Sequence, residues 1–255
     1  LYDPVRGEMR LGRDRHTGRT VWIPSKDGQP HAIRAGSSRY ELVVSLDSSE
    51  EGGWTGSGVL VTGGPLSAYG DIAGVDGETG GHLGRVARTA LEGADLEDHS
   101  LALLKDTGVV AGFTLRLDEP EADDSGRILI EMGDPAGGVM ASLPSDVHVY
   151  SEHRDSPVRL AGPMEQTFTL VVGLGDREIV RLPDERSLEN TAGSFTLAVE
   201  EGTDRVTITR TLILNPPALV DRVEQIIHVE PDMWPDLRAL LLEESDHRNR
   251  VILLE

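Results

Sequence analysis

Residues 206 to 214 carry the clearest pattern of apolar and polar positions in this chain. Apolar residues fill the even positions except at Arg210, and Thr207, Thr209 and Thr211 lie between them. This alternation with a period of two is typical of a strand with one buried face. We therefore predict a half-buried strand whose apolar side is interrupted by one arginine.

Similar patterns, bounded by turn signals, predict strands through much of the chain. The predicted strands cover residues 40–46, 54–62, 109–117, 127–132, 167–174, 178–182, 194–200, 205–214 and 251–254. Short loops of turn-forming residues predict hairpins between the first and second, the fifth and sixth, and the seventh and eighth of these strands. The fourth is expected to return after the third. Gly56 and Gly58, inside the second strand, indicate a bulge or a close approach of backbone.

Helical spacing of apolar residues occurs in three segments. Their apolar positions are Leu83, Val86, Ala87, Ala90 and Leu91; Leu96, Leu101, Leu103 and Leu104; and Trp234, Leu237, Leu240 and Leu241. In the third segment Pro235 falls in the first turn, where proline is tolerated. Residues 219–229 fit a helix and a strand equally well. The sequence thus predicts a mainly β fold with α+β character, in which antiparallel, sandwich-like sheets accompany a few helices, including one near the C-terminus.

Changes in composition along the chain predict three parts. Residues 1–37 are rich in Arg, Gly, Asp and Pro and are expected to form an arm or linker. Residues 38–164 are expected to form a strand-rich α+β domain, and residues 165–255 a β-rich domain closed by the C-terminal helix and strand.

The charge balance excludes some classes of partner. Among 255 residues, 44 are acidic and 24 are basic, which gives a formal net charge of -20. Such a charge repels phosphate backbones and anionic membrane surfaces, so nucleic acid is not expected as a partner. There is also no apolar run of the roughly 18 residues that a membrane span needs, so no membrane insertion by this chain is expected.

The residue types that are scarce or missing narrow the chemistry further. Aromatic residues make up 4% of the chain, so extensive stacking platforms for bases or sugars are not expected. Because the chain contains no cysteine, it has no disulfide, no thiolate zinc site and no cysteine nucleophile. No cofactor is predicted.

Several groups of residues could carry chemistry, and each also has a plain structural interpretation. His148 and His153 lie near acidic residues, but five-residue spacing without a third ligand favours exposed loop histidines over a zinc site. The glycine-rich residues 70–84 offer oxygen ligands for calcium at Asp71, Asp76 and Glu78, without the spacing of a known calcium loop. A mobile turn is the alternative there.

An acidic cluster follows the strand at 109–117. It consists of Asp118, Glu119, Glu121, Asp123 and Asp124 and is most simply a solvated loop. Paired carboxylates for glycoside hydrolysis remain an alternative, because that pairing depends on distance and has no fixed spacing in the sequence. The segment Gly56-Ser57-Gly58-Val59 matches a serine-protease strand only weakly, because no suitable histidine or Gly-Asp-Ser-Gly motif follows it.

Short motifs at both ends of the chain resemble the C-terminal portion of bacterial transglutaminase-like proteins. Tyr2-Asp3-Pro4 looks like the last strand of their papain-like core, and Trp22-Ile23-Pro24 is similar to the segment after that core. The helix at Trp234-Pro235-Asp236-Leu237-Arg238, the closing Val251-Ile252-Leu253, and the strand and helix between residues 63 and 88 also match. The resemblance implies a β-rich region of unassigned function and a periplasmic or extracellular location.

The chain departs from that family's pattern at the catalytic residues. By resemblance Asp3 would be the third member of a Cys, His, Asp triad, yet the family's Cys and His lie upstream of this motif. His16 and His31 follow Asp3, and neither matches the triad histidine. Asp3 is therefore the one candidate catalytic residue, as an isolated triad member, and a turn-forming Asp before proline is the alternative.

Three functions are compatible with these observations. The first is a non-catalytic accessory or interaction domain that supports or positions an upstream transglutaminase-like core or another protein partner. The second is a stand-alone β-sandwich module that binds peptide or carbohydrate. The third is an acidic hydrolase, for which the sequence provides least support.

Overall fold

The computed structural model describes residues 37–49, 52–67, 78–103, 108–160, 162–215 and 227–255, together with four short strands near the N-terminus. These strands are β1 (Tyr2–Asp3), β2 (Glu8–Met9), β3 (Thr20–Trp22) and β4 (Pro30–Ala32). They form two antiparallel pairs, β1 with β2 and β3 with β4.

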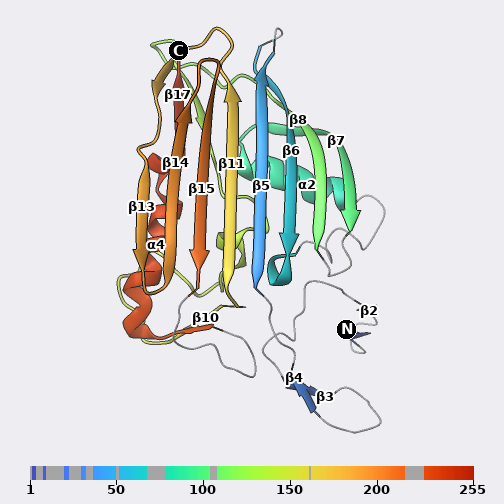
Figure 1. The fold of residues 1–255 in the computed structure, drawn as a ribbon, viewed down its shortest axis with the longest axis vertical. Helices are drawn as coiled ribbons and strands as arrows, with labels where there is room; N and C mark the ends of the chain where they lie inside the picture. Colours follow the sequence, from blue (N-terminus) through green and yellow to red (C-terminus); the bar gives the residue numbers. More distant parts are fainter. Residues whose placement is uncertain are drawn as a thin grey trace.

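An eight-stranded sheet forms the centre of the fold (Figure 1). In spatial order its strands are β13 (Arg186–Asn190), β14 (Gly193–Glu201), β15 (Arg205–Leu214), β11 (Met164–Gly173), β5 (Ser38–Ser48), β6 (Trp54–Gly63), β8 (Val109–Leu117) and β7 (Ala94–Leu103). All neighbours are antiparallel except β11 and β5, which pair in parallel. Strands from both expected domains, 38–164 and 165–255, therefore lie in one sheet.

The two faces of this sheet differ because the side chains alternate along each strand. In β15, Val206, Ile208, Leu212 and Leu214 are buried on one side together with Arg210, while the threonines between them are half-buried. The hydroxyls of Thr169 and Thr209 lie 3.2 Å apart across the neighbouring strands. The alternation read from the sequence is thus the alternation between a core face and a more exposed face.

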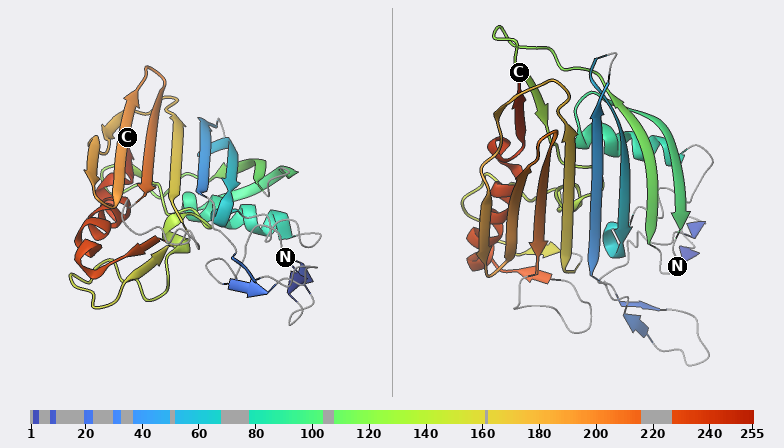
Figure 2. Two further views of the ribbon diagram at one scale, coloured as in Figure 1. Left: turned by 60° about the horizontal axis from the view of Figure 1, so that its bottom comes forward. Right: turned by 45° about the horizontal axis from the view of Figure 1, so that its top comes forward.

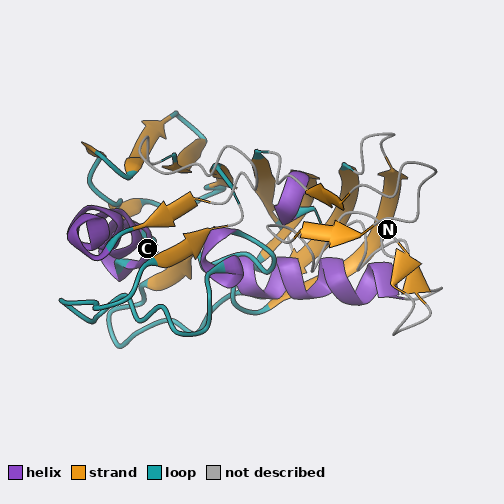
Figure 3. Ribbon diagram, turned by 90° about the horizontal axis from the view of Figure 1, so that it is seen from below, coloured by secondary structure: helices purple, strands orange, loops and turns teal. Residues whose placement is uncertain are grey.

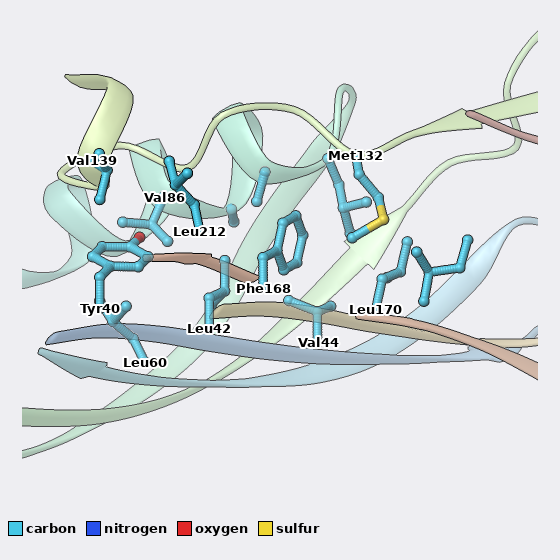
Figure 4. Close-up of a cluster of buried hydrophobic side chains, with 14 of the residues drawn as sticks. Tyr40, Leu42, Val44, Leu60, Val86, Met132, Val139, Phe168, Leu170 and Leu212 are labelled. Atoms are coloured by element: carbon cyan, nitrogen blue, oxygen red, sulfur yellow. The ribbon is translucent and has the colours of Figure 1, made fainter. Parts of the chain in front are cut away.

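Helices cover the core face. Figure 3 shows α2 (Glu78–Ala90) and α4 (Trp234–Ser245) on the same side of the large sheet. The short α3 (Val139–Ser142) contacts β11 on that side as well. Figure 4 shows side chains of β5 and β11 meeting those of α2 and of the segment after β9, for example at Leu42, Phe168, Val86 and Met132. All four are at most 1% exposed.

Two small sheets complete the fold (Figure 2). The first is antiparallel and contains, in spatial order, β12 (Ile179–Arg181), β17 (Val251–Leu254) and β9 (Ile128–Glu131). The second pairs β10 (Val158–Leu160) with β16 (Ile227–Val229). Three single turns of 3-10 helix are η1 (Gly64–Leu66), η2 (Pro231–Met233) and η3 (His247–Asn249).

The predicted fold class is confirmed, as are several of its elements. The hairpins β5–β6 and β14–β15 form as predicted. The apolar faces predicted for α2 and α4 are buried at every position named above. Of the undecided segment 219–229, only the strand β16 lies within the described residues. No helix among the described residues is long and apolar enough to cross a membrane.

The glycines of β6 permit close approach and do not form a bulge. The pairing of β6 with both neighbours is continuous. A Cβ atom built on Gly58 would collide with the ring of Phe113, and one on Gly56 would collide with the carbonyl of Ser45. Close backbone approach was therefore the correct one of the two alternatives.

The second predicted helix, around Leu96 to Leu104, is wrong. Residues 94–103 form β7, which pairs with β8 and ends the sheet on that side. Leu101 is 37% exposed and Leu96 is only partly buried, so the leucine spacing does not correspond to a buried helix face. Pairing with β8 has overridden the local spacing.

The predicted partners of two strands were also wrong. β11 lies between β15 and β5, so it has no free edge for β12, which pairs with β17 instead. Likewise β8 is occupied by β6 and β7, and β9 pairs with β17. In both cases the strand pairs with a strand that is distant in sequence and not with its neighbour in sequence. Turn signals in the sequence do not reveal such distant pairing.

Candidate functional site

A charged pair lies inside the core, between β15 and α4. Arg210 is 2% exposed and Glu244 is 1% exposed. The Nη2 atom of Arg210 lies 2.8 Å from Oε1 of Glu244 and donates to the Glu244 carbonyl oxygen at 2.6 Å. The Nη1 atom of Arg210 donates to the carbonyl oxygen of Met132 at 3.3 Å. One arginine thus ties the end of α4 and the segment after β9 to the sheet.

Three further side chains extend this pair. Gln166 in β11 donates from Nε2 to Oε1 of Glu244 at 2.9 Å and accepts a hydrogen bond from the backbone N–H of Val139 at 2.7 Å. Arg250 donates from Nε to the Glu244 carbonyl oxygen at 3.0 Å, and its Nη2 lies 2.6 Å from Oδ1 of Asp134. We call these five polar residues the buried ion network, and its members are Asp134, Gln166, Arg210, Glu244 and Arg250.

Burial is the dominant influence on the charge of Glu244. Burial raises the pKa of the Glu244 carboxyl above its usual range, more strongly than the attraction of Arg210 lowers it. Within the described residues, Oε2 of Glu244 and Nε of Arg210 have no hydrogen-bond partner. The charged groups face one another and backbone carbonyls, so the arrangement holds α4 against the sheet.

A pocket of about 300 Å³ lies on the surface, between the end of β8, the turn after α2, and β9. Its lining residues are Leu91, Glu92, Gly93, Leu117, Asp118, Glu119, Pro120, Leu129, Ile130 and Glu131. Leu91, Leu117 and Ile130 are buried, whereas Leu129 is 40% exposed. The pocket therefore combines leucine and isoleucine side chains with four carboxylates, and no basic residue lines it.

Three of these four carboxylates lie beside basic residues, two of them arginines and one a histidine. Asp118 pairs with Arg116 at 3.0 Å, Glu119 with Arg177 at 2.6 Å, and Glu131 with His247 at 3.3 Å. Glu92 has no ion pair with any described residue.

Arg177 connects the pocket to the large sheet. Its guanidinium lies 4.6 Å from the centre of the Trp54 ring, and Nη1 lies 3.4 Å from the hydroxyl of Ser48. The Trp54 indole N–H in turn donates to the carbonyl oxygen of Gly173 at 3.0 Å. The wall that carries Glu119 is therefore tied to β5, β6 and β11.

The predicted acidic cluster divides into two parts. Asp118 and Glu119 line the pocket, whereas Glu121 and Asp124 are exposed away from it. Asp123 accepts hydrogen bonds from the backbone N–H groups of Arg127 and Ser125, and these bonds lower the pKa of its carboxyl. The interpretation as a solvated loop fits all five residues, which are exposed, and Asp118 and Glu119 in addition line the pocket.

Most of the other predicted site residues have side chains outside the part of the chain that the structure describes. Asp3 lies in β1 opposite Glu8 of β2, and its side chain is outside the described residues, as are His16, Asp71 and Asp76. The catalytic role of Asp3 therefore stays a prediction.

His148 and His153 are exposed, in the loop between α3 and β10. This loop is fixed to α4, because the Trp234 indole N–H donates to the carbonyl oxygen of Ser151 at 2.9 Å and Arg238 donates to that of Val149 at 2.9 Å. No group of three or more metal-ligating side chains occurs in the part of the chain that the structure describes.

Sequence reasoning noticed only one member of the buried ion network. Arg210 interrupts the alternation of β15 and was visible as a charge where an apolar residue is expected. Glu244 has the same signature, because it follows Leu240 and Leu241 by four and three residues on the buried face of α4. A basic and an acidic residue, each at a position where the pattern of its element calls for an apolar residue, are therefore the signal that predicts a buried pair.

Comparison with known proteins gives a partial match. A family model described as "Domain of Unknown Function with solved-structure structure" (DUF3858) matches residues 140–254. This range contains Gln166, Arg210, Glu244 and Arg250, but not the residues that line the pocket. A comparison with the curated proteins finds no match.

Among solved structures, the chain is similar to one described as a "putative protease" from Parabacteroides distasonis. The identity is 19%, the TM-score is 0.42, and the match covers 52% of this chain and 24% of that protein. This chain thus spans about a quarter of that protein's length. In this β-rich chain, residues 140–254 thus resemble a domain family of unknown function.

Proposed function

We propose that this chain is a non-catalytic accessory module that supports or positions a transglutaminase-like core or another protein partner. The sequence motifs that resemble those proteins, among them the Asp3-Pro4 pair and the helix from Trp234, support this relationship. A transglutaminase-like or papain-like reaction needs a thiolate nucleophile next to a base. A chain without cysteine cannot provide that nucleophile.

The buried ion network is the observation that carries the proposal. Arg210, Glu244 and Arg250 are the arginines and carboxylates that are buried in the described part of the chain, and their contacts are with one another, with Gln166 and Asp134, and with backbone carbonyls. A catalytic acid or base must reach a substrate. Since none of the five lines the pocket, these groups have a structural task and leave no buried charge for chemistry there.

A stand-alone module that binds peptide is the second candidate. The pocket favours it, because its apolar and acidic lining suits a peptide side chain. Carbohydrate is the weaker ligand, since Tyr150 is the one exposed aromatic among the described side chains while Trp54 and Trp234 are buried. Sugar recognition commonly needs an exposed aromatic face.

The acidic hydrolase is supported least. Glycoside hydrolysis uses two carboxylates with separate roles, one as acid and one as base or nucleophile. In the pocket three of the four carboxylates are already held by Arg116, Arg177 and His247. That leaves Glu92 alone without an ion pair among the described residues.

Activity assays on the purified chain test the proposal. We expect no peptide hydrolysis and no transfer of an amine to glutamine by this chain, with or without calcium. We further expect it to co-elute in size-exclusion chromatography with a separately expressed transglutaminase-like core. Turnover by this chain alone, abolished by a substitution within it, would show that the proposal is wrong.

A further inference from the structure

The pocket beside β8 has two properties that together specify an occupant. Leu91, Leu117 and Ile130 give it buried apolar side chains, and Leu129 adds a partly exposed one. The charged side chains of its lining, Glu92, Asp118, Glu119 and Glu131, are all negative. A group that fills it must therefore be apolar along its length and positive at its end.

The C-terminal end of α2 adds negative potential at the same place. Leu91, Glu92 and Gly93 follow the last residue of this 13-residue helix directly, and all three line the pocket. The C-terminus of a helix carries a partial negative charge that favours cations. At the end of α2 the carbonyls of Ala87 and Ala90 already accept hydrogen bonds from the backbone N–H groups of Leu91 and Gly133, so the contribution of the helix is secondary to that of the carboxylates. The helix end and the four carboxylates therefore attract the same sign of charge.

The volume of the pocket limits the size of the occupant. About 300 Å³ is at the lower end of the range for small-molecule sites, so it accommodates one or two side chains and not a large cofactor. A bare metal ion does not fit the arrangement, since the described residues contain no group of three ligands that could hold one. A long side chain with an aliphatic stem and a cationic head meets both requirements.

We propose that this pocket binds an arginine side chain, flanked by apolar residues, from an extended segment of a protein partner. The aliphatic stem lies against the leucines, and the guanidinium lies among the carboxylates. The guanidinium of the partner pairs with Glu92, which has no ion pair with a described residue. It also replaces Arg116 beside Asp118 or His247 beside Glu131 at the rim of the pocket. A planar guanidinium can also form paired hydrogen bonds with a carboxylate, which an ammonium cannot.

This inference rests on the proposed function, because it names the chemistry of the partner that the module holds. The net charge of -20 also favours a basic segment as the partner and speeds its encounter with the chain.

Calorimetric titration with a short peptide tests the inference. The probe is acetyl-Ala-Leu-Arg-Leu-Ala-amide, and the matched peptides replace Arg by Lys, by citrulline or by Glu. We expect saturable binding of the Arg peptide that weakens with added salt, weaker binding of the Lys peptide, and none of the citrulline and Glu peptides. Equal binding of the Arg and citrulline peptides, or no saturation by the Arg peptide, overturns the inference.

Variants of the chain locate the binding to the pocket. Glu92→Gln removes the carboxylate that has no ion pair, and we expect the dissociation constant to rise about three- to fivefold, as for an exposed charge pair. Glu121→Gln is the matched control, because Glu121 is exposed on the neighbouring loop and does not line the pocket. If both variants weaken binding equally, the attraction is only that of the net charge, and the assignment to this pocket is wrong.

A separate measurement distinguishes this inference from the proposed function. The Glu92→Gln and Glu131→Gln double variant is mixed with the transglutaminase-like core. Unchanged association of the double variant overturns the pocket as the contact and leaves the accessory function in place. Weakened association, together with unchanged unfolding by urea, supports both.

Discussion

The buried ion network and the pocket are two clusters of charge in the same chain, and they differ in how the charge is satisfied. In the network two arginines, two carboxylates and an amide are packed between β15, β11, α4 and the segment after β9. In the pocket four carboxylates line the wall, and the basic residues beside three of them, Asp118, Glu119 and Glu131, lie outside the lining. The comparison indicates that the charges of the network are satisfied inside the fold, whereas the lining of the pocket presents charge of one sign at the surface.

The largest expected effect is at Arg210. Arg210→Met removes a buried partner of Glu244 and the donor to two backbone carbonyls, so we expect a loss of about 3 to 5 kcal/mol in the free energy of unfolding. Urea unfolding measures it. Arg205→Met is the matched control on the same strand, since Arg205 is exposed and its one ion pair among the described residues is with the exposed Asp204; we expect a change within about 0.5 kcal/mol.

A double variant shows whether Arg210 and Glu244 act as a pair. Arg210→Met combined with Glu244→Gln removes both charges and keeps an amide opposite Gln166. We expect it to be more stable than Arg210→Met alone, because no uncompensated carboxylate remains in the core. Additive losses from the two substitutions would contradict the role assigned to the pair.

The pH dependence of stability is expected to reveal the burial of Glu244. Its pKa is raised in the folded chain, so its contribution to stability is fully present below the unfolded value of about 4.3 and is lost as the pH rises through the folded pKa. Glu244→Gln lacks this titration. The free energy of unfolding of the wild type, minus that of Glu244→Gln, should therefore fall as the pH rises. A difference that is constant with pH would contradict the raised pKa.

A smaller effect is expected where the pocket meets the sheet. Arg177→Ala removes the ion pair with Glu119 and the contact of the guanidinium with the Trp54 ring, so we expect a loss of about 1 kcal/mol. Arg116→Ala is the control, because Arg116 pairs with Asp118 in an exposed position, and little change is expected from it. Equal losses from both variants would show that the contact with Trp54 adds nothing.

The smallest effect is expected at Glu92, and its sign is opposite. Glu92→Gln removes a negative charge from the C-terminal end of α2 and from among three other carboxylates. We expect a gain of a few tenths of a kcal/mol in the free energy of unfolding. A loss of more than about 1 kcal/mol would mean that the pocket, like the network, has a structural task.

The sequence correctly predicted those elements in which the apolar positions are also the buried positions. The buried faces of α2, α4 and β15 are those read from their spacing, because each buries one face of a regular element against the core. β7 was predicted as a helix because its leucines happen to have helical spacing, although pairing with β8 decides its conformation. The local pattern of apolar residues was sufficient to predict the conformation of a segment only where pairing with another strand did not override it.

The sites were predicted less well than the elements, for a physical reason. The pocket combines the turn after α2, the end of β8 and β9, which are brought together by packing and have no common spacing in the sequence. The network joins residues as far apart as Asp134 and Arg250. Its signal in the sequence was the charge of Arg210 among apolar neighbours, and Glu244 in α4 carries the same signal.

If this chain is an accessory module, it binds a partner and performs no chemistry of its own. Calorimetric titration of the chain with a separately expressed transglutaminase-like core is the decisive measurement. We expect saturable binding with a stoichiometry of one, weakened by Glu92→Gln with Glu131→Gln and unchanged by Glu121→Gln. The absence of any saturable binding between the two folded proteins would contradict it.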